Sequence, residues 1–268
     1  LHHYNKRHGL RLFDRLVAYL PRYAGGASKI APLLNLRDKI PGLAGLSEVL
    51  LGFSSKRKLP VWSGNPFRLN EAGSENAGGP EVVLWADTFS TYFEPENARA
   101  AAKVLVAAGY RVHMAKPAAG ERPLCCGRTF LAAGLVDEAK TEARRMLDAL
   151  RPFAERGVPV VGLEPPCLYT LRDEFQAMVP GEDTDKLANN AFLFEEFLSR
   201  EHETGTLSLD LESAAGNRVM LHGHCHQKAF DAMSAVETVL RLIPDLEVET
   251  IRSGCCGMAG AFGYDADN

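Results

Sequence analysis

The spacing of hydrophobic residues changes near residue 78 of this 268-residue chain. Before that point, short stretches with helical spacing are interrupted by prolines, which end or kink a helix. We therefore predict a helical arm or linker over residues 1–78. Its expected helical stretches are Leu10–Tyr19, Ala27–Leu34 and Leu46–Gly52. A basic cluster, Lys56–Lys58, is interpreted as a solvated loop, and the polar, glycine-rich stretch Glu71–Gly79 as a boundary.

From Pro80 onward the pattern alternates between short apolar runs and longer stretches with helical spacing. Short apolar runs bounded by turn residues are typical of buried strands, and the stretches between them are typical of covering helices. The expected strands are Glu81–Ala86, Tyr110–Met114 and Val158–Leu163. The expected helices are Glu96–Ala108, a long helix that ends near Glu155, and Leu187–Arg200.

The same order then begins a second time. Strand Arg218–His222, helix Ala229–Leu242 and strand Leu246–Thr250 lead again to Cys-Cys-Gly. This internal repeat predicts an α/β fold of duplicated βα units with small parallel sheets, preceded by the helical arm. We place the first half at residues 79–205 and the second at residues 206–268.

The cysteines follow this repeat. Two adjacent pairs, Cys125-Cys126 and Cys255-Cys256, each precede a glycine, while Cys167 and Cys225 stand alone. Six cysteines are too few for a disulfide scaffold, and adjacent cysteines rarely bond to each other. Each follows a predicted strand, and ligands of parallel α/β sheets gather where the strands end. We therefore expect the thiols to converge at these rims, with Glu164–Cys167 as a rigid strand exit.

Thiolates at such a rim are soft donors suited to iron–sulfur clusters or zinc. The cofactor ligands predicted from the residues are therefore all six cysteines. His224 and His226 flank Cys225 and either hydrogen-bond cluster sulfurs or serve as zinc ligands. In the first half we align Asp87 with Cys225, as either a further metal ligand or a plain helix N-cap.

Composition adds three expectations. The net charge of −4 argues against a nucleic-acid surface. No apolar run is long enough to cross a bilayer, and no signal peptide opens the chain. A cytoplasmic protein is therefore expected, with peripheral membrane association only through partners. Because the chain starts without Met and stops soon after a glycine-rich motif, we expect it to be a piece of a longer polypeptide.

Several motifs resemble a known family. The two Cys-Cys-Gly motifs with separate cysteines resemble the duplicated cysteine-rich CCG domain of the heterodisulfide reductase B subunit, the glycolate oxidase iron–sulfur subunit and the lactate-utilisation proteins. The closer resemblance is to the C-terminal half of fused FAD-linked oxidases, the D-lactate and D-2-hydroxyglutarate dehydrogenases. The stretches that carry it are Asp87–Phe89, Leu124–Arg128, Glu164–Leu168, His224–Lys228 and Gly254–Ala259 with Phe262–Tyr264. It covers nearly the whole chain.

The resemblance implies an iron–sulfur (4Fe-4S) electron-transfer domain of a 2-hydroxyacid dehydrogenase acting on D-lactate, glycolate or D-2-hydroxyglutarate. It implies FAD-binding and ferredoxin-like domains elsewhere in the same protein, a quinone or carrier protein as electron acceptor, and a further cysteine beyond Asn268. Asp87 in place of a cysteine puts a full cluster in the first half in doubt. Alone, the fragment should not oxidise a hydroxyacid. Two alternatives stay open: a zinc-stabilised interaction module, and a thiol–disulfide enzyme like heterodisulfide reductase.

Overall fold

The computed structural model describes residues 1–68, 70–71 and 78–268. The predicted boundary Glu71–Gly79 lies mostly outside the described residues. In the arm, the helices are α1 (His2–His8), α2 (Leu12–Ala18), α3 (Leu20–Lys29), α4 (Ala31–Leu34), the 3-10 turn η1 (Asn35–Asp38) and α5 (Leu43–Leu51). The predicted helical N-terminus is therefore confirmed, with more helices than the apolar spacing indicated.

The first half is built around one parallel sheet. Its strands are β1 (Glu81–Trp85), β2 (Arg111–Met114), β3 (Val160–Gly162) and β4 (Ala191–Leu193), in the order β2-β1-β3-β4. Its helices are α6 (Thr88–Tyr92), α7 (Pro95–Ala107), α8 (Arg128–Ala132), α9 (Val136–Ala154), α10 (Pro165–Arg172), α11 (Glu174–Met178), α12 (Glu182–Asn190) and α13 (Phe194–Glu203).

Both faces of this sheet are covered. Val83 and Trp85 of β1 point into one hydrophobic core, while Val82 and Leu84 point into another on the opposite face. Phe130 lies in the first core and Phe197 in the second. Continuous apolar runs such as Glu81–Trp85 are expected for strands buried on both sides, so the sequence pattern and the packing agree.

The second half contains a smaller parallel pair, β5 (Arg218–Leu221) and β6 (Glu247–Thr250), with Arg218 opposite Glu247. Its helices are α14 (Cys225–Ala229) and α15 (Met233–Arg241), and the 3-10 turn η2 (Phe262–Tyr264) lies near the end of the described chain. Every second residue of both strands is exposed, so the pair is covered on one face only. The predicted small parallel sheets are confirmed in both halves.

Two predicted helices are divided in the structure. The single helix expected over Leu187–Arg200 is divided into α12, β4 and α13, because a short apolar stretch inside it pairs with β3 as an edge strand. The expected long helix that ends near Glu155 is confirmed as α9, but the chain just after the Cys-Cys-Gly turn forms a separate short helix, α8, because Gly134 adopts a left-handed backbone between the two. Short apolar runs do not distinguish strand from helix by spacing alone.

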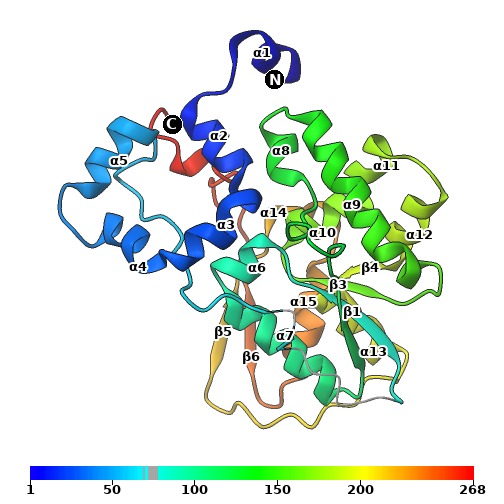
Figure 1. Cartoon of the computed structure of the whole chain (residues 1–268). Coiled ribbons are helices and arrows are strands. Elements are labelled where there is room, and N and C mark those ends of the chain that lie inside the picture. Colours follow the sequence, from blue (N-terminus) through cyan, green and yellow to red (C-terminus); the bar gives the residue numbers. More distant parts are fainter. Residues whose placement is uncertain (69, 72–77) are drawn as a thin grey trace.

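The halves and the arm contact one another directly (Figure 1). Tyr169 of α10 stacks on Phe230, which follows α14, with ring centroids 4.2 Å apart. The arm also contacts the other end of the chain, because Arg11 pairs with Asp265 at 2.6 Å. Within the described part of the chain, no helix combines the length and the apolar character needed to span a membrane.

Candidate functional site

The six cysteines form two groups of three. Cys125, Cys126 and Cys167 are buried in the first half, and we call them the inner thiol group. Cys225 is half-buried while Cys255 and Cys256 are exposed in the second half, and we call these three the outer thiol group. Each group lies where parallel strands end, as the sequence pattern predicted: the inner one after β2 and β3, the outer one after β5 and β6.

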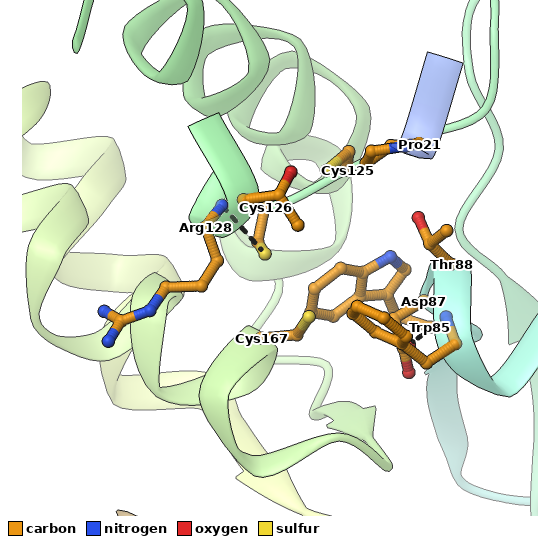
Figure 2. Close-up of a pocket in the computed structure, with 10 residues that line it drawn as sticks. Pro21, Trp85, Asp87, Thr88, Cys125, Cys126, Arg128 and Cys167 are labelled. Atoms are coloured by element: carbon orange, nitrogen blue, oxygen red, sulfur yellow. Dashed lines mark hydrogen bonds between the residues drawn. The ribbon is translucent and has the colours of Figure 1, made fainter. Parts of the chain in front are cut away.

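The inner thiol group lines a small pocket beneath the arm (Figure 2). Trp85, at the end of β1, forms one wall, and Pro21 of α3 and Arg128 of α8 also line the pocket. Figure 2 shows the sulfur atoms of Cys126 and Cys167 and the edge of the Trp85 indole around this space. Cys167 enters the pocket from the first turn of α10, because Pro165 and Pro166 begin that helix. The expected rigid strand exit is therefore a helix start.

Burial keeps the inner thiols protonated. The side-chain contact with Cys126, together with burial, raises the pKa of Cys125, and burial raises the pKa of Cys126. The contact with Cys126 lowers the pKa of Cys167, but burial and the neighbouring Asp87 and Glu164 outweigh it and raise that pKa to about 12. A bound cation would favour the thiolates, so metal binding here would release protons.

The outer thiol group is open to solvent. The Cys225 Sγ atom lies 3.2 Å from Cys255 Sγ. A backbone hydrogen bond from Gly257, followed by the contact with Cys225, lowers the pKa of Cys255, whereas the same sulfur contact raises the pKa of Cys225. Of Cys225 and Cys255, ionisation is therefore favoured at Cys255.

The two Cys-Cys-Gly turns have the same backbone geometry. Gly127 has φ of 83° and Gly257 has φ of 80°, in the left-handed region that favours glycine. In each turn the glycine N–H donates to the sulfur two residues earlier, Gly127 to Cys125 and Gly257 to Cys255, both at 3.3 Å. Gly127 is also close-packed, because a Cβ there would lie 2.9 Å from the carbonyl oxygen of Ala139. The repeat seen in the sequence therefore extends to the main-chain environment of the sulfurs.

The helix caps show that one predicted correspondence between residues of the two halves was wrong. Asp87 caps α6 and accepts from the Phe89 N–H at 2.7 Å and from the Ser90 hydroxyl at 2.6 Å. His224 caps α14 in the second half, where its Nδ1 accepts from the His226 N–H at 3.2 Å. Asp87 therefore corresponds to His224, and Thr88 corresponds to Cys225. Because both Asp87 oxygens accept hydrogen bonds, the N-cap interpretation of this residue is the one observed.

Two buried ring nitrogens, on Trp85 and His226, lack a hydrogen-bond partner. Among the described residues, the side-chain N and O atoms that are buried without a hydrogen-bond partner are Trp85 Nε1 and His226 Nδ1. Figure 2 shows the indole nitrogen turned toward the gap among Cys125, Cys126 and Thr88. His226 Nε2 lies 3.4 Å from an Arg128 guanidinium nitrogen, which can only donate, so Nδ1 carries the proton.

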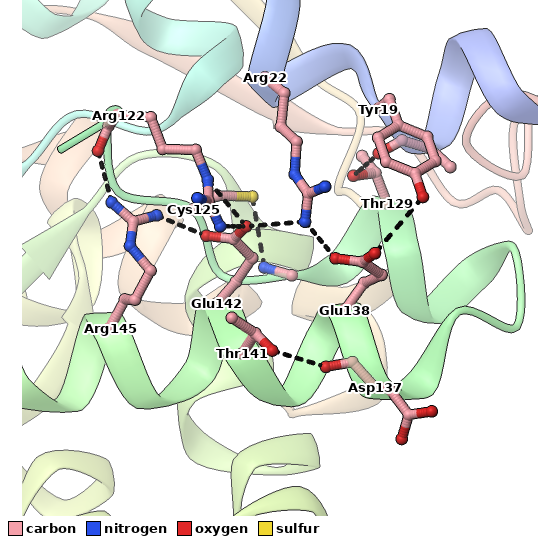
Figure 3. Close-up of polar contacts among 12 residues, drawn as sticks. Tyr19, Arg22, Arg122, Cys125, Thr129, Asp137, Glu138, Thr141, Glu142 and Arg145 are labelled. Atoms are coloured by element: carbon pink, nitrogen blue, oxygen red, sulfur yellow. Dashed lines mark hydrogen bonds and ion pairs between the residues drawn. The ribbon is translucent and has the colours of Figure 1, made fainter.

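The arm closes the inner thiol group, which the sequence analysis did not predict. Figure 3 shows Arg22 of α3 over α9, where it pairs with Glu138 and lies 3.5 Å from Glu142. The Glu142 carboxylate is 1% exposed and also accepts from Arg122 at 2.5 Å and Arg145 at 2.6 Å. The sequence signal was a glutamate on the apolar stripe of a helix, because a buried carboxylate needs cationic partners.

The cysteine sulfurs are the kind of ligand that a soft metal ion prefers. The distances between these sulfurs, however, are those of thiols in contact with one another. Within residues 1–68, 70–71 and 78–268, no group of three or more His, Cys, Asp or Glu side chains is arranged to hold a metal ion. Thiolates are the ligands of iron–sulfur clusters, but each group offers three sulfurs where such a cluster usually has four cysteine ligands, so a further ligand would be needed in each half.

Comparison with known proteins identifies relatives among dehydrogenases. The chain is 27% identical over 247 residues to the anaerobic glycerol-3-phosphate dehydrogenase C subunit of Escherichia coli, a match that covers 90% of this chain and 60% of that protein. It is 24% identical over 277 residues to D-2-hydroxyglutarate dehydrogenase of Pantoea ananatis, covering 99% and 26% respectively. It is 30% identical over 191 residues to the Pseudomonas putida D-2-hydroxyglutarate dehydrogenase, covering 70% and 17%. No protein-family model and no solved structure matches.

These three relatives are dehydrogenases or a dehydrogenase subunit, that is, oxidoreductases, and this chain is similar to a part of each. The chain is similar over most of its length to parts of these dehydrogenase proteins, in agreement with the resemblance of its sequence motifs. It spans 60% of the glycerol-3-phosphate dehydrogenase relative and about a quarter of the D-2-hydroxyglutarate dehydrogenase of Pantoea ananatis.

Proposed function

We propose that this chain is the iron–sulfur electron-transfer part of a flavin-linked dehydrogenase. The observation that carries the proposal is the repeated sulfur turn: two Cys-Cys-Gly motifs follow equivalent parallel strand pairs and place the glycine N–H at the same distance from the first sulfur. Buried structural cysteines would not require this repetition. Its relatives are dehydrogenases, which is the context in which such a relay is needed.

The proposed ligands are the inner and outer thiol groups. Cys125, Cys126 and Cys167 would bind a cluster inside the first half, and Cys225, Cys255 and Cys256 would bind one at the surface of the second half. An iron–sulfur cluster accepts and donates single electrons when it is bound. The main-chain N–H groups of Gly127 and Gly257 stabilise negative charge on the sulfurs, and the unpartnered Trp85 N–H, on a residue that lines the same pocket as the inner thiol group, supplies a further donor.

The substrate is oxidised elsewhere in this proposal. D-2-hydroxyglutarate, D-lactate and glycolate are the proposed substrates of the whole protein, with FAD and a ferredoxin-like domain in other parts of it and a quinone or carrier protein as the acceptor. The relatives' names include both glycerol-3-phosphate and D-2-hydroxyglutarate dehydrogenases, which fits a relay module that does not touch the substrate itself. The chain alone is expected to show no hydroxyacid oxidation.

Anaerobic reconstitution with iron and sulfide tests the proposal. Iron and sulfide content, visible absorbance and the electron paramagnetic resonance of the reduced protein should report cluster formation in the 268-residue chain. Cys126→Ser should remove the inner signal and Cys255→Ser the outer one, while Ser253→Ala, a change in the same loop as Cys255 that removes no thiol, should leave both.

The competing functions give different results in the same experiment. Zinc bound without iron or sulfide would favour a zinc-stabilised interaction module. A protein that binds neither metal but forms a reversible disulfide between Cys225 and Cys255, whose sulfurs lie 3.2 Å apart, would favour thiol–disulfide chemistry. Either outcome contradicts the proposed electron relay.

A further inference from the structure

The N-terminal arm differs from the rest of the chain in charge and in surface character. Twelve Lys and Arg against three Asp and Glu give residues 1–68 a formal charge of +9, whereas the remaining residues carry −13. Among the described residues, thirteen of the sixteen exposed large hydrophobic side chains lie between residues 1 and 61. Positive charge and exposed apolar surface are therefore concentrated in the same quarter of the chain.

The helix α5 is the centre of this surface. It is predominantly apolar yet has no buried residue, whereas an apolar helix in a globular protein is normally packed inside it. Leu46, Val49 and Leu50 are 53%, 83% and 61% exposed and occupy one helical face, because residues three and four positions apart lie side by side. Figure 1 shows α4 and α5 at the edge of the molecule, away from the sheets.

A basic loop lies against this helix. The Ser55 N–H donates to the Glu48 carboxylate of α5 at 2.5 Å, and the carbonyl oxygen of Arg57 accepts from Arg37 at 3.1 Å. Lys56, Arg57 and Lys58 are therefore held beside α5, and all three side chains are exposed. We define the α5 surface as Leu46, Val49 and Leu50 together with Lys56, Arg57 and Lys58.

The acidic residues of this region, Asp38 and Glu48, each accept a main-chain hydrogen bond. Glu48 accepts the Ser55 N–H, and Asp38 accepts the Leu59 N–H at 2.9 Å and pairs with Arg37. The three basic side chains of the α5 surface make no ion pair with any residue that the structure describes. The outward charge of the α5 surface is thus positive.

We propose that the α5 surface binds the interface of an anionic lipid bilayer. Its apolar side chains are all aliphatic, and two of its three basic residues are lysines. Protein–protein interfaces are instead enriched in aromatic residues and depleted in lysine. Aliphatic side chains beside a lysine-rich loop match a membrane surface, where the acyl boundary takes the apolar face and anionic head groups attract the basic residues.

Vesicle flotation of the 268-residue chain tests this proposal. Vesicles of phosphatidylcholine with phosphatidylglycerol should bind the chain, pure phosphatidylcholine vesicles should bind it at least about tenfold more weakly, and added salt should release it. Leu50→Glu should weaken binding by about tenfold. Met220→Glu is its matched control, because Met220 is also 61% exposed but lies on β5, and binding should be retained.

A second pair of variants separates local charge from net charge. Reversing Lys56, Arg57 and Lys58 to glutamate should lower binding by about tenfold or more. Reversing Lys103, Lys116 and Arg144, which are exposed in the first half, changes the net charge equally and should leave most of the binding. Circular dichroism of each variant verifies folding, which substitutions of exposed side chains should preserve.

Four outcomes overturn the proposal. Equal binding to both vesicle types, or no binding to either, excludes an anionic bilayer as the occupant. A wild-type dimer that Leu50→Glu converts to a monomer, without lipid binding, assigns the α5 surface to a second copy of the chain. Equal losses in the two triple variants attribute the attraction to net charge and not to this surface.

Discussion

The two thiol groups share a motif but differ in almost everything around it. The inner group follows a sheet covered on both faces, and Pro21 of the arm lines its pocket. The outer group follows a two-stranded sheet covered on one face, and two of its three thiols are exposed. The same Cys-Cys-Gly turn occurs in both. The turn therefore determines the local geometry of the sulfurs. The helices and strands packed over each group determine whether its thiols are protonated and whether solvent reaches them.

The largest expected difference is in thiol reactivity. In the chain without metal, iodoacetamide should modify Cys255 and Cys256 at least about 100-fold faster than Cys125, Cys126 and Cys167, because the buried thiols are protonated and reachable only through local opening. Peptide mass spectrometry over time measures the rates. Equal rates at all six cysteines would show that the arm does not close the inner thiol group in solution.

The next difference concerns pH. Burial, followed by the neighbouring Asp87 and Glu94, raises the pKa of Glu164 beside the inner thiol group to about 8. The folded state then binds more protons than the unfolded state, so Glu164 makes the free energy of unfolding fall as pH rises from about 4.5 to about 8. Glu164→Gln should remove this slope and stabilise the protein by about 1–3 kcal/mol at the upper end of the range.

Chemical denaturation at several pH values measures this effect. Glu237→Gln is a suitable control on the other half, because the hydrogen bond from Thr250 lowers the pKa of Glu237. That substitution should not stabilise the protein at high pH. A Glu164→Gln variant with the unchanged pH slope would contradict the assignment.

A smaller difference separates the two motif glycines. Gly127→Ala and Gly257→Ala both place a side chain at φ near 80°, which costs about 1 kcal/mol. At Gly127 the new Cβ would also meet the Ala139 carbonyl oxygen at 2.9 Å, whereas nothing lies within 4 Å at Gly257. We expect a loss of about 3 kcal/mol for the first variant and about 1 kcal/mol for the second. Thermal unfolding that ranked them in the reverse order would contradict the packing described here.

The smallest expected difference is between the two helix caps. Asp87→Ala removes a buried cap with several donors and should destabilise the protein by about 2 kcal/mol. His224→Ala removes one cap bond of 3.2 Å on the outer side and should cost about 0.5 kcal/mol. The same unfolding measurement compares them, and similar losses would remove this distinction between the halves.

The sequence predicted the strands of the first sheet well, because residues such as Val82 and Val83 belong to short continuous apolar runs, which are typical of strands buried on both faces. It predicted the repeat and the positions of all six cysteines after strands. It did not predict β4, since Ala191–Leu193 becomes a strand only through pairing with β3. Local spacing carries no information about that partner.

The sequence predicted which cysteines form the candidate site, but it did not predict which residues surround them. The division into inner and outer groups depends on the arm, and the contact of Arg22 with Glu138 joins positions 116 residues apart. The equivalence of Asp87 and His224 was likewise hidden, because an aspartate and a histidine share no obvious role until both are seen to cap a helix. Long-range contacts of this kind are set by tertiary packing.

The N–H···S hydrogen bonds of the two sulfur turns come from the main chain, and this limits how the sulfurs can be altered. A side-chain donor could be lost or replaced by a single codon change, but the amide protons of Gly127 and Gly257 persist in any variant that keeps the backbone bend. Differences in protonation and accessibility between the two sulfur groups must therefore come from what is packed around the turns. The inner and outer thiol groups therefore have the same main-chain hydrogen bonds to sulfur but differ in how deeply those sulfurs are buried.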